Sequence, residues 1–184
     1  MARTESTMLE LGTLAPDFAL PNVVTGQIVR RDEVHGKGLL VMFICTHCPY
    51  VKHVERELAK IGAEYEGSAL RIVAISSNDA TMYPDDGPEG LKQQAETMGF
   101  RFPYLHDEMQ EVAKTYKAAC TPDFFLFDRS LRLVYRGQLD GSRPGNGIPV
   151  TGENLRAAMN ALLTGEAISE EQRPSLGCNI KWKA

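Results

Sequence analysis

The sequence predicts an α/β fold, a mixed central sheet flanked by helices, in a single domain that spans residues 1–184. The runs 39–44 and 70–76 are short and continuously apolar, as in strands buried on both faces. A helical spacing of apolar residues follows each run, and a hairpin pattern appears later in the chain. Strands that alternate with helices and then end in a hairpin and a helix are typical of a mixed sheet covered by helices.

The expected elements follow one another in the order β-β-β-α-β-α-α-β-β-α. Two short strands around a turn at Thr25–Gly26 predict an N-terminal β-hairpin extension. Apolar residues spaced three and four apart from Val51 to Tyr65 predict the first helix, with Pro49 in its first turn. The remaining elements are a strand at 70–76, helices near 89–98 and 107–116, a hairpin of 124–127 and 131–137, and a helix over 151–165. The tail, 166–184, has no clear period and is expected to lie outside the core motif.

Composition and charge narrow the classes of function that the protein could have. The net charge of −4 gives no reason to expect binding to nucleic acid or to a membrane surface. No apolar stretch approaches the roughly 20 residues that span a bilayer, and the N-terminus lacks the apolar run of a secretory signal. A cytoplasmic location is therefore expected, where thiols are kept reduced. Four cysteines in that compartment favour catalysis or metal binding over structural disulfides.

Cys45 and Cys48 lie between the end of a buried strand and the start of a helix, in the stretch "ICTHCPYVKH". A helix N-terminus offers unpaired N–H groups and about half a positive charge, which stabilises a thiolate. We expect Cys45 to be exposed there with a lowered pKa, and Cys48 to be shielded one turn further on. His47 is expected to tune the thiolate by adding positive charge or a hydrogen bond, which would make the disulfide more oxidising.

Strand, Cys-x-x-Cys, proline and helix together resemble the thioredoxin fold. The segment "LGTLAPDFALPNVVTG" is similar to the opening of the alkyl hydroperoxide reductase/thiol-specific antioxidant superfamily, the peroxiredoxin-like or redoxin branch of that fold. "CTPDFFLFD", residues 120–128, resembles the segment that carries the cis-proline of the fold and is followed by its hairpin. The resemblance covers about residues 10–165.

The resemblance implies a thiol–disulfide oxidoreductase with a redox-active disulfide. Cys45 would attack and Cys48 would resolve the mixed disulfide, while a cis peptide at Thr121–Pro122 would face Cys45 and shape the substrate groove. No organic cofactor is needed, because the electrons reside on the sulfurs. The implied partners are protein or small-molecule disulfides, or peroxides, together with a thiol electron donor.

Two alternatives remain open. One is a thiol-dependent peroxidase with antioxidant activity, in which Cys45 or Cys48 is oxidised to sulfenic acid and a second cysteine resolves it. The sequence departs from peroxiredoxins here, because Val41 and Cys45 stand where their motif has proline and threonine, and their late arginine has no counterpart in 119–122. The other alternative is a metal-binding or structural protein. Cys45, His47, Cys48 and His53 are possible zinc ligands, but their close spacing and the lack of a second ligand pair favour no metal.

Two further thiols complete the set. Cys120 precedes the expected cis-proline, so it is either close to the active site or a small buried apolar residue. Cys178 lies in the tail, where it could serve as an extra resolving thiol. We expect instead that it packs with Ile180 and Trp182 against the body of the protein.

Overall fold

A five-stranded mixed sheet forms the centre of the molecule in the computed structural model, which describes residues 3–34 and 36–184. The strands lie in the order β6-β5-β4-β8-β9. Their bounds are Gly38–Phe43 (β4), Leu70–Ser76 (β5), Tyr104–His106 (β6), Asp123–Asp128 (β8) and Leu133–Gly137 (β9). β4 pairs parallel with β5 and antiparallel with β8, which confirms the predicted mixed sheet.

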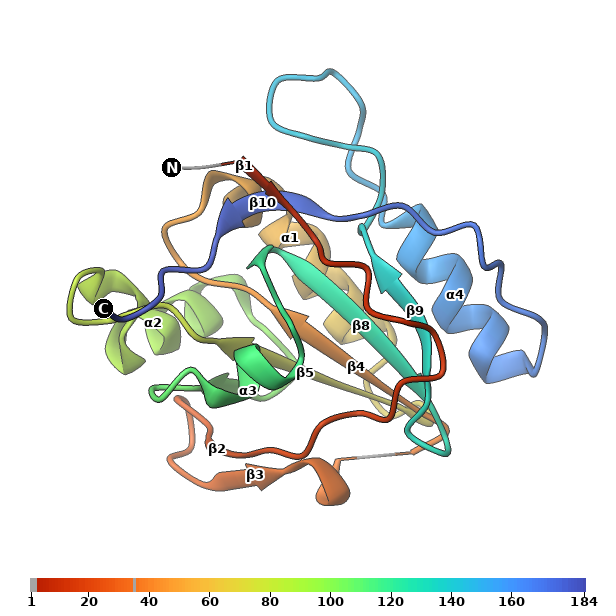
Figure 1. Cartoon of the computed structure of the whole chain (residues 1–184), viewed down its shortest axis with the longest axis horizontal. Helices are drawn as coiled ribbons and strands as arrows, with labels where there is room; N and C mark the ends of the chain where they lie inside the picture. Colours follow the sequence, from red (N-terminus) through yellow and green to blue (C-terminus); the bar gives the residue numbers. More distant parts are fainter. Residues whose placement is uncertain (1–2, 35) are drawn as a thin grey trace.

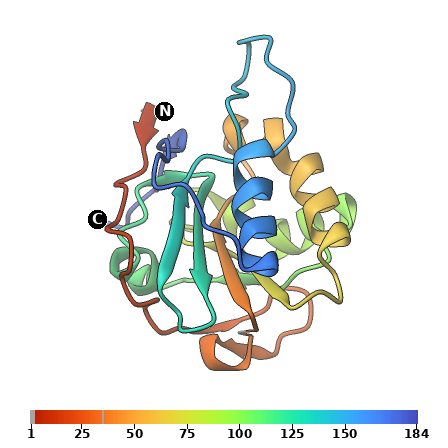
Figure 2. The ribbon, with the colours of Figure 1, turned by 90° about the vertical axis from the view of Figure 1, so that its right-hand side faces the viewer.

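Helices cover both faces of this sheet. Their bounds are Pro49–Glu64 (α1), Pro88–Met98 (α2), Glu111–Thr115 (α3) and Glu153–Thr164 (α4), with short 3-10 turns at Arg31–Glu33 and Pro84–Asp86. Figures 1 and 2 show α1 and α4 on one face, and α3 with the N-terminal segment on the other. Within the described residues, none of the helices combines the length and the apolar character needed to cross a membrane.

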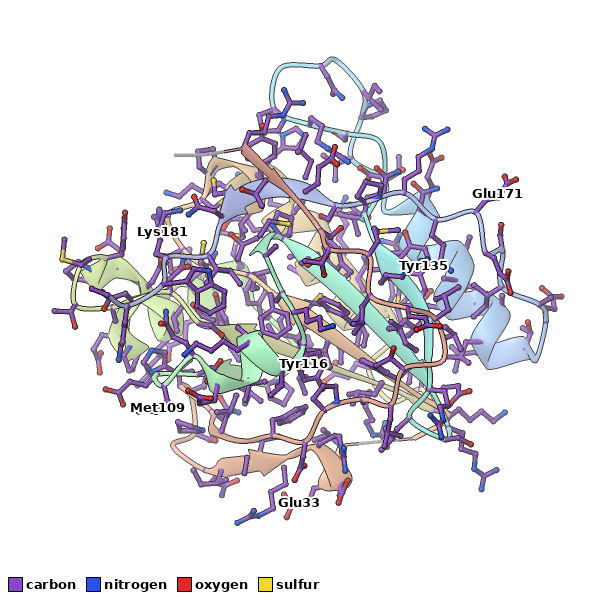
Figure 3. All side chains as sticks on the ribbon, viewed as in Figure 1. Glu33, Met109, Tyr116, Tyr135, Glu171 and Lys181 are labelled. Carbon is purple, nitrogen blue, oxygen red and sulfur yellow. The ribbon has the colours of Figure 1, made fainter. Side chains whose placement is uncertain are left out.

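Successive side chains of β4 point to opposite faces of the sheet, and this explains why the core has two layers, one on each face. Leu40 and Met42 pack into the cluster that contains α1, α2 and α4, whereas Leu39 and Val41 pack into the cluster beneath α3. All four side chains are fully buried, as predicted for a strand covered on both faces. Tyr116, just after α3, points into the second layer, in contrast to the exposed Met109 at the periphery (Figure 3).

The helix expected over 107–116 is shorter in the structure. Gln110 has a left-handed backbone with φ of 62°, so the regular helix begins only at Glu111. The Asp107 carboxylate accepts the N–H of Ala113 at 2.9 Å and satisfies one of the unpaired donors at this helix end.

β2 (Ala19–Pro21) and β3 (Ile28–Arg30) pair antiparallel and confirm the N-terminal hairpin extension.

Segments near the two chain termini form a further, three-stranded sheet that the sequence did not indicate. β1 (Arg3–Glu5), β10 (Leu176–Asn179) and β7 (Cys120–Thr121) form the additional sheet in the order β1-β10-β7. The tail therefore contains a strand, which runs beside β1 in Figure 1. This strand has only four residues, too few to show a hydrophobic period in the sequence. It is held in place by pairing with the distant strands β1 and β7.

Candidate active site

The two motif cysteines lie where β4 gives way to α1. The N–H of Ile44 still donates to the Ile75 carbonyl at 3.0 Å, and the chain leaves the sheet after this bond. Cys48 is the N-cap of α1, and Pro49 opens the helix as predicted. The sulfur of Cys48 therefore lies at a helix terminus with unpaired N–H groups, and the N–H of Val51 lowers the pKa of this thiol.

Thr121 contacts both sulfurs. Its hydroxyl lies 3.4 Å from the Sγ atom of Cys45, and its carbonyl oxygen lies 3.3 Å from the Sγ atom of Cys48. The Thr121–Pro122 peptide bond is cis, as the resemblance implied. The thiols of Cys45 and Cys48 are also hydrogen-bonded to each other. The structure thus brings together the dithiol and the expected substrate groove.

The expected exposure of Cys45 is wrong. Its side chain is 1% exposed, and that of Cys48 is 0% exposed. The tail contributes to this burial: β10 pairs with β7, the strand that leads into the cis peptide, and its Cys178 sulfur lies 2.7 Å from that of Cys48. A partner can reach the dithiol only after this cover moves.

The expected charge distribution within the dithiol is also reversed. The pKa of Cys48 is lowered to about 5, chiefly by the hydrogen bond from the Cys45 thiol, with further donors from Cys178 and from the Val51 N–H. The pKa of Cys45 is raised, first by its hydrogen bond to Cys48, then by burial and by the negative charge of Asp86. Of the two sulfurs, Cys48 is therefore the one whose negative charge the surroundings favour.

His47 is directed at a buried carboxylate. Its Nδ1 atom lies 2.5 Å from Oδ2 of Asp86, and its ring stacks on Tyr83 at 4.9 Å between centroids. Its other ring nitrogen is buried without a hydrogen-bond partner among the described residues. The predicted role of His47 in tuning the thiolate stays a prediction, and it would have to act through Asp86.

Asp86 is the site residue that sequence reasoning missed. It is 0% exposed and accepts hydrogen bonds from the Thr46 N–H at 2.8 Å and from the Asn78 amide at 2.8 Å. A usable signal did exist. β4 and β5 are parallel, so the loops that follow their carboxyl ends meet at one edge of the sheet, and "YPDDGPEG" follows β5. This arrangement predicts that the acidic loop after β5 lies close to the Cys-x-x-Cys loop after β4.

The structure does not bring together the four possible zinc ligands Cys45, His47, Cys48 and His53. His53 lies on α1 and pairs with the Ser142 hydroxyl at 2.7 Å, away from the sulfurs. Cys45, His47 and Asp86 do have ligand atoms within 4.8 Å of one another. A metal bound by these three would have to replace the hydrogen bond between His47 and Asp86.

The two remaining thiols have different surroundings. Cys120 is fully buried, and burial followed by the charge of Asp123 raises its pKa far above the usual range, as expected for an inert core thiol. Cys178 is 3% exposed, and its Sγ atom lies 2.7 Å from that of Cys48. It is thus a third member of the sulfur cluster as well as part of the packed tail. Ile180 packs into the core as expected, whereas Trp182 is 43% exposed.

The chain is similar to known proteins in both sequence and fold. Residues 11–136 match the AhpC/TSA family, which is two thirds of the chain. The chain belongs to the AhpC/TSA family. This member is 28% identical over 130 residues to the thiol-disulfide oxidoreductase ResA of Geobacillus kaustophilus, covering 69% of this chain and 68% of that protein.

Two solved structures extend the comparison of this AhpC/TSA member. The crystal structure of an uncharacterized conserved protein from Geobacillus kaustophilus is 57% identical, covers 100% of this chain and 97% of its own, and has a TM-score of 0.98. The thioredoxin domain of a thiol-disulfide oxidoreductase from Bacteroides vulgatus is 20% identical, covers 71% of this chain and 89% of its own, and has a TM-score of 0.60. The fold is therefore thioredoxin-like, as the sequence resemblance implied.

Proposed function

We propose that this protein is a thiol–disulfide oxidoreductase in which Cys45 and Cys48 are oxidised together while a partner disulfide is reduced. The observation that carries the proposal is the hydrogen-bonded pair of sulfurs at the N-terminus of α1, both in contact with the residue before a cis-proline. Its similarity to ResA, a thiol-disulfide oxidoreductase, supports the same chemistry. The partners would be protein or small-molecule disulfides, with a thiol donor to restore the reduced state.

The order of attack follows the charge. A thiolate is the nucleophile in disulfide exchange, and the lowered pKa of Cys48, with its place at the N-terminus of α1, supports Cys48 in that role. Cys48 would attack a partner sulfur to form a mixed disulfide and release the partner's other sulfur as a thiolate. Cys45 would then attack the Sγ atom of Cys48 and release the partner's remaining sulfur. Two protein thiols are oxidised and one partner disulfide is reduced. This order is the reverse of the one expected from the sequence.

Separate replacement of the two cysteines tests both the activity and the order. Wild-type protein should reduce a model protein disulfide, whereas Cys48→Ala should neither reduce it nor form an adduct. Cys45→Ala should accumulate mixed disulfides that vanish with reductant on non-reducing gels after acid quenching. Adducts on Cys48→Ala instead would restore Cys45 as the attacking sulfur. Failure of the wild type to reduce the disulfide would contradict the proposed function itself.

A further inference from the structure

The tail strand β10 places a third thiol directly at the dithiol. Cys178 is paired in register with Thr121, the residue that precedes the cis-proline. Its Sγ atom lies 2.7 Å from that of Cys48, so Cys48 has one thiol neighbour from its own loop and a second from the tail. Among the four cysteines, Cys48 is the one in hydrogen-bond contact with two others.

The tail is fitted to this position by its own sequence. A Cβ atom on Gly177 would lie 1.9 Å from the Thr121 carbonyl oxygen, so only glycine permits the close approach of β10 to the cis peptide. The Ser175 hydroxyl donates to the Pro122 carbonyl at 2.5 Å on one side of Cys178. On the other side, the Lys181 carbonyl accepts the Asp79 N–H at 2.8 Å. Cys178 is therefore held beside Cys48 by contacts on both flanks.

We propose that Cys178 is a second resolving thiol, which competes with Cys45 for the mixed disulfide on Cys48. This inference rests on the proposed function, because the partner disulfide supplies the oxidising equivalents. The Cys178 sulfur attacks the Sγ atom of Cys48, the bond between Cys48 and the partner breaks, and the departing partner sulfur takes up the proton from Cys178. One disulfide is consumed and one is formed, so no other oxidant is needed.

The surroundings of Cys178 favour this step once Cys48 has reacted. Burial first, then the hydrogen bond to Cys48 and the negative charge on that sulfur, together raise the pKa of Cys178 to about 12. A mixed disulfide on Cys48 has no negative charge, so the last of these effects disappears when resolution is required. After a partner has reacted, the return of β10 to its place brings the Cys178 sulfur back beside that of Cys48, and this gives the attack a high effective concentration.

The product of this route differs from the Cys45–Cys48 disulfide. A Cys48–Cys178 bond leaves Cys45 as a free thiol and links β10 covalently to the N-terminus of α1. The tail would then be held over the site until a reductant opens the bond. The two oxidised forms thus differ in whether the cover over the sulfurs can move.

Resolution by Cys178 can be measured in the absence of Cys45. Reduced Cys45→Ser and the double variant Cys45→Ser/Cys178→Ser are mixed with 2-hydroxyethyl disulfide, quenched with acid over time, and examined by intact mass and peptide mapping. Serine at 45 retains a hydroxyl that can donate to Cys48. In Cys45→Ser the mercaptoethanol adduct should decay at least about tenfold faster than in the double variant, because the return of β10 brings the attacking sulfur beside its target. The final product should map to Cys48–Cys178. Cys120→Ala in the Cys45→Ser background serves as the control and should leave this decay unchanged.

The outcomes separate the two proposals. Equal persistence of the adduct in Cys45→Ser and in the double variant would overturn the role of Cys178. A Cys45→Ser variant that does not react, while the wild type does, would overturn it as well, since Cys48 would not be the point of entry. The Cys178→Ser variant retains the Cys45–Cys48 pair and should still form that disulfide. Failure of both the wild type and Cys178→Ser to form it would contradict the proposed function.

Discussion

Cys48 is the sulfur whose ionisation controls the proposed chemistry. The Cys45 thiol, Cys178 and the helix terminus lower its pKa to about 5, so we expect wild-type thiolate absorbance to rise near pH 5. The thiol of Cys45 is the largest stabiliser of that charge, and Cys45→Ala should therefore shift the rise to higher pH. A Cys48→Ser variant identifies the signal, because it should lack the low-pH rise. An unchanged midpoint in Cys45→Ala would show that the helix terminus and Cys178 suffice.

Asp86 should raise the pKa of the other motif cysteine, Cys45. Its negative charge disfavours the Cys45 thiolate and raises the pKa of Cys45, so Asp86→Asn should lower that pKa. The comparison is made in a variant whose other three cysteines are alanine, with thiolate absorbance followed against pH. Asp85→Asn removes the same formal charge from an exposed neighbour and should leave the midpoint in place. Equal shifts in both variants would point to a general charge effect instead of contact through the buried carboxylate.

The residues of the site differ in how far the sequence could predict them. Cys45, Cys48 and Pro122 belong to local patterns, a Cys-x-x-Cys at a strand–helix junction and a Thr-Pro before an apolar strand, and these could be read directly. Asp86 and Cys178 reach the sulfurs through the packing of separate loops and strands, which local spacing does not contain. The expected exposure of Cys45 was wrong because contacts from such distant segments were missing from the sequence argument.

β10 is the element that brings the tail against Cys48. The main strands were predictable because continuous apolar runs mark them, whereas β10 is four residues long and depends on pairing with β1 and β7. Its position requires Gly177, whose backbone lies against the cis peptide. The position of β10 therefore depends less on the strand propensity of its own residues than on the strands with which it pairs.

Gly177→Ala should push β10 away from the sulfurs. The added Cβ atom would meet the Thr121 carbonyl carbon at 2.6 Å, and a backbone neighbour cannot move aside as a flexible side chain can. We expect a loss of about 1–3 kcal/mol in the free energy of unfolding, typical of overpacking, and faster alkylation of Cys48 in the native protein. Gly141→Ala is the matched control, because its Cβ atom would meet only the Ile148 side chain at 4.0 Å. Unchanged alkylation in Gly177→Ala would mean that β10 does not limit access.

The complete fold joins an AhpC/TSA framework to a site that lacks peroxiredoxin groups. The sheet order and the helices on both faces bring the loops after β4, after β5 and before β8 to one end, where the termini cover them. Peroxide cleavage needs donors directed at both oxygens as charge develops on the leaving oxygen. Val41 lies buried inside β4, and Cys45 takes the position of the peroxiredoxin threonine. The AhpC/TSA framework is shared, whereas the sequence departs from the peroxiredoxin motif at Val41 and Cys45.

We therefore expect the reduced protein to react faster with a disulfide than with hydrogen peroxide. Second-order rates for both oxidants, followed by intact mass under the same conditions, provide the measurement. Arg143 is the cation to examine if the order is reversed, because it lines the small cavity beside Pro122 together with Tyr50. Arg143→Gln should leave a slow peroxide rate unchanged, since the guanidinium is held by the Gln138 side chain at 2.7 Å and by the Asp140 carbonyl at 2.7 Å. A peroxide rate that exceeds the disulfide rate and falls in Arg143→Gln would show that this arginine replaces the missing donor, and would make the protein a peroxidase.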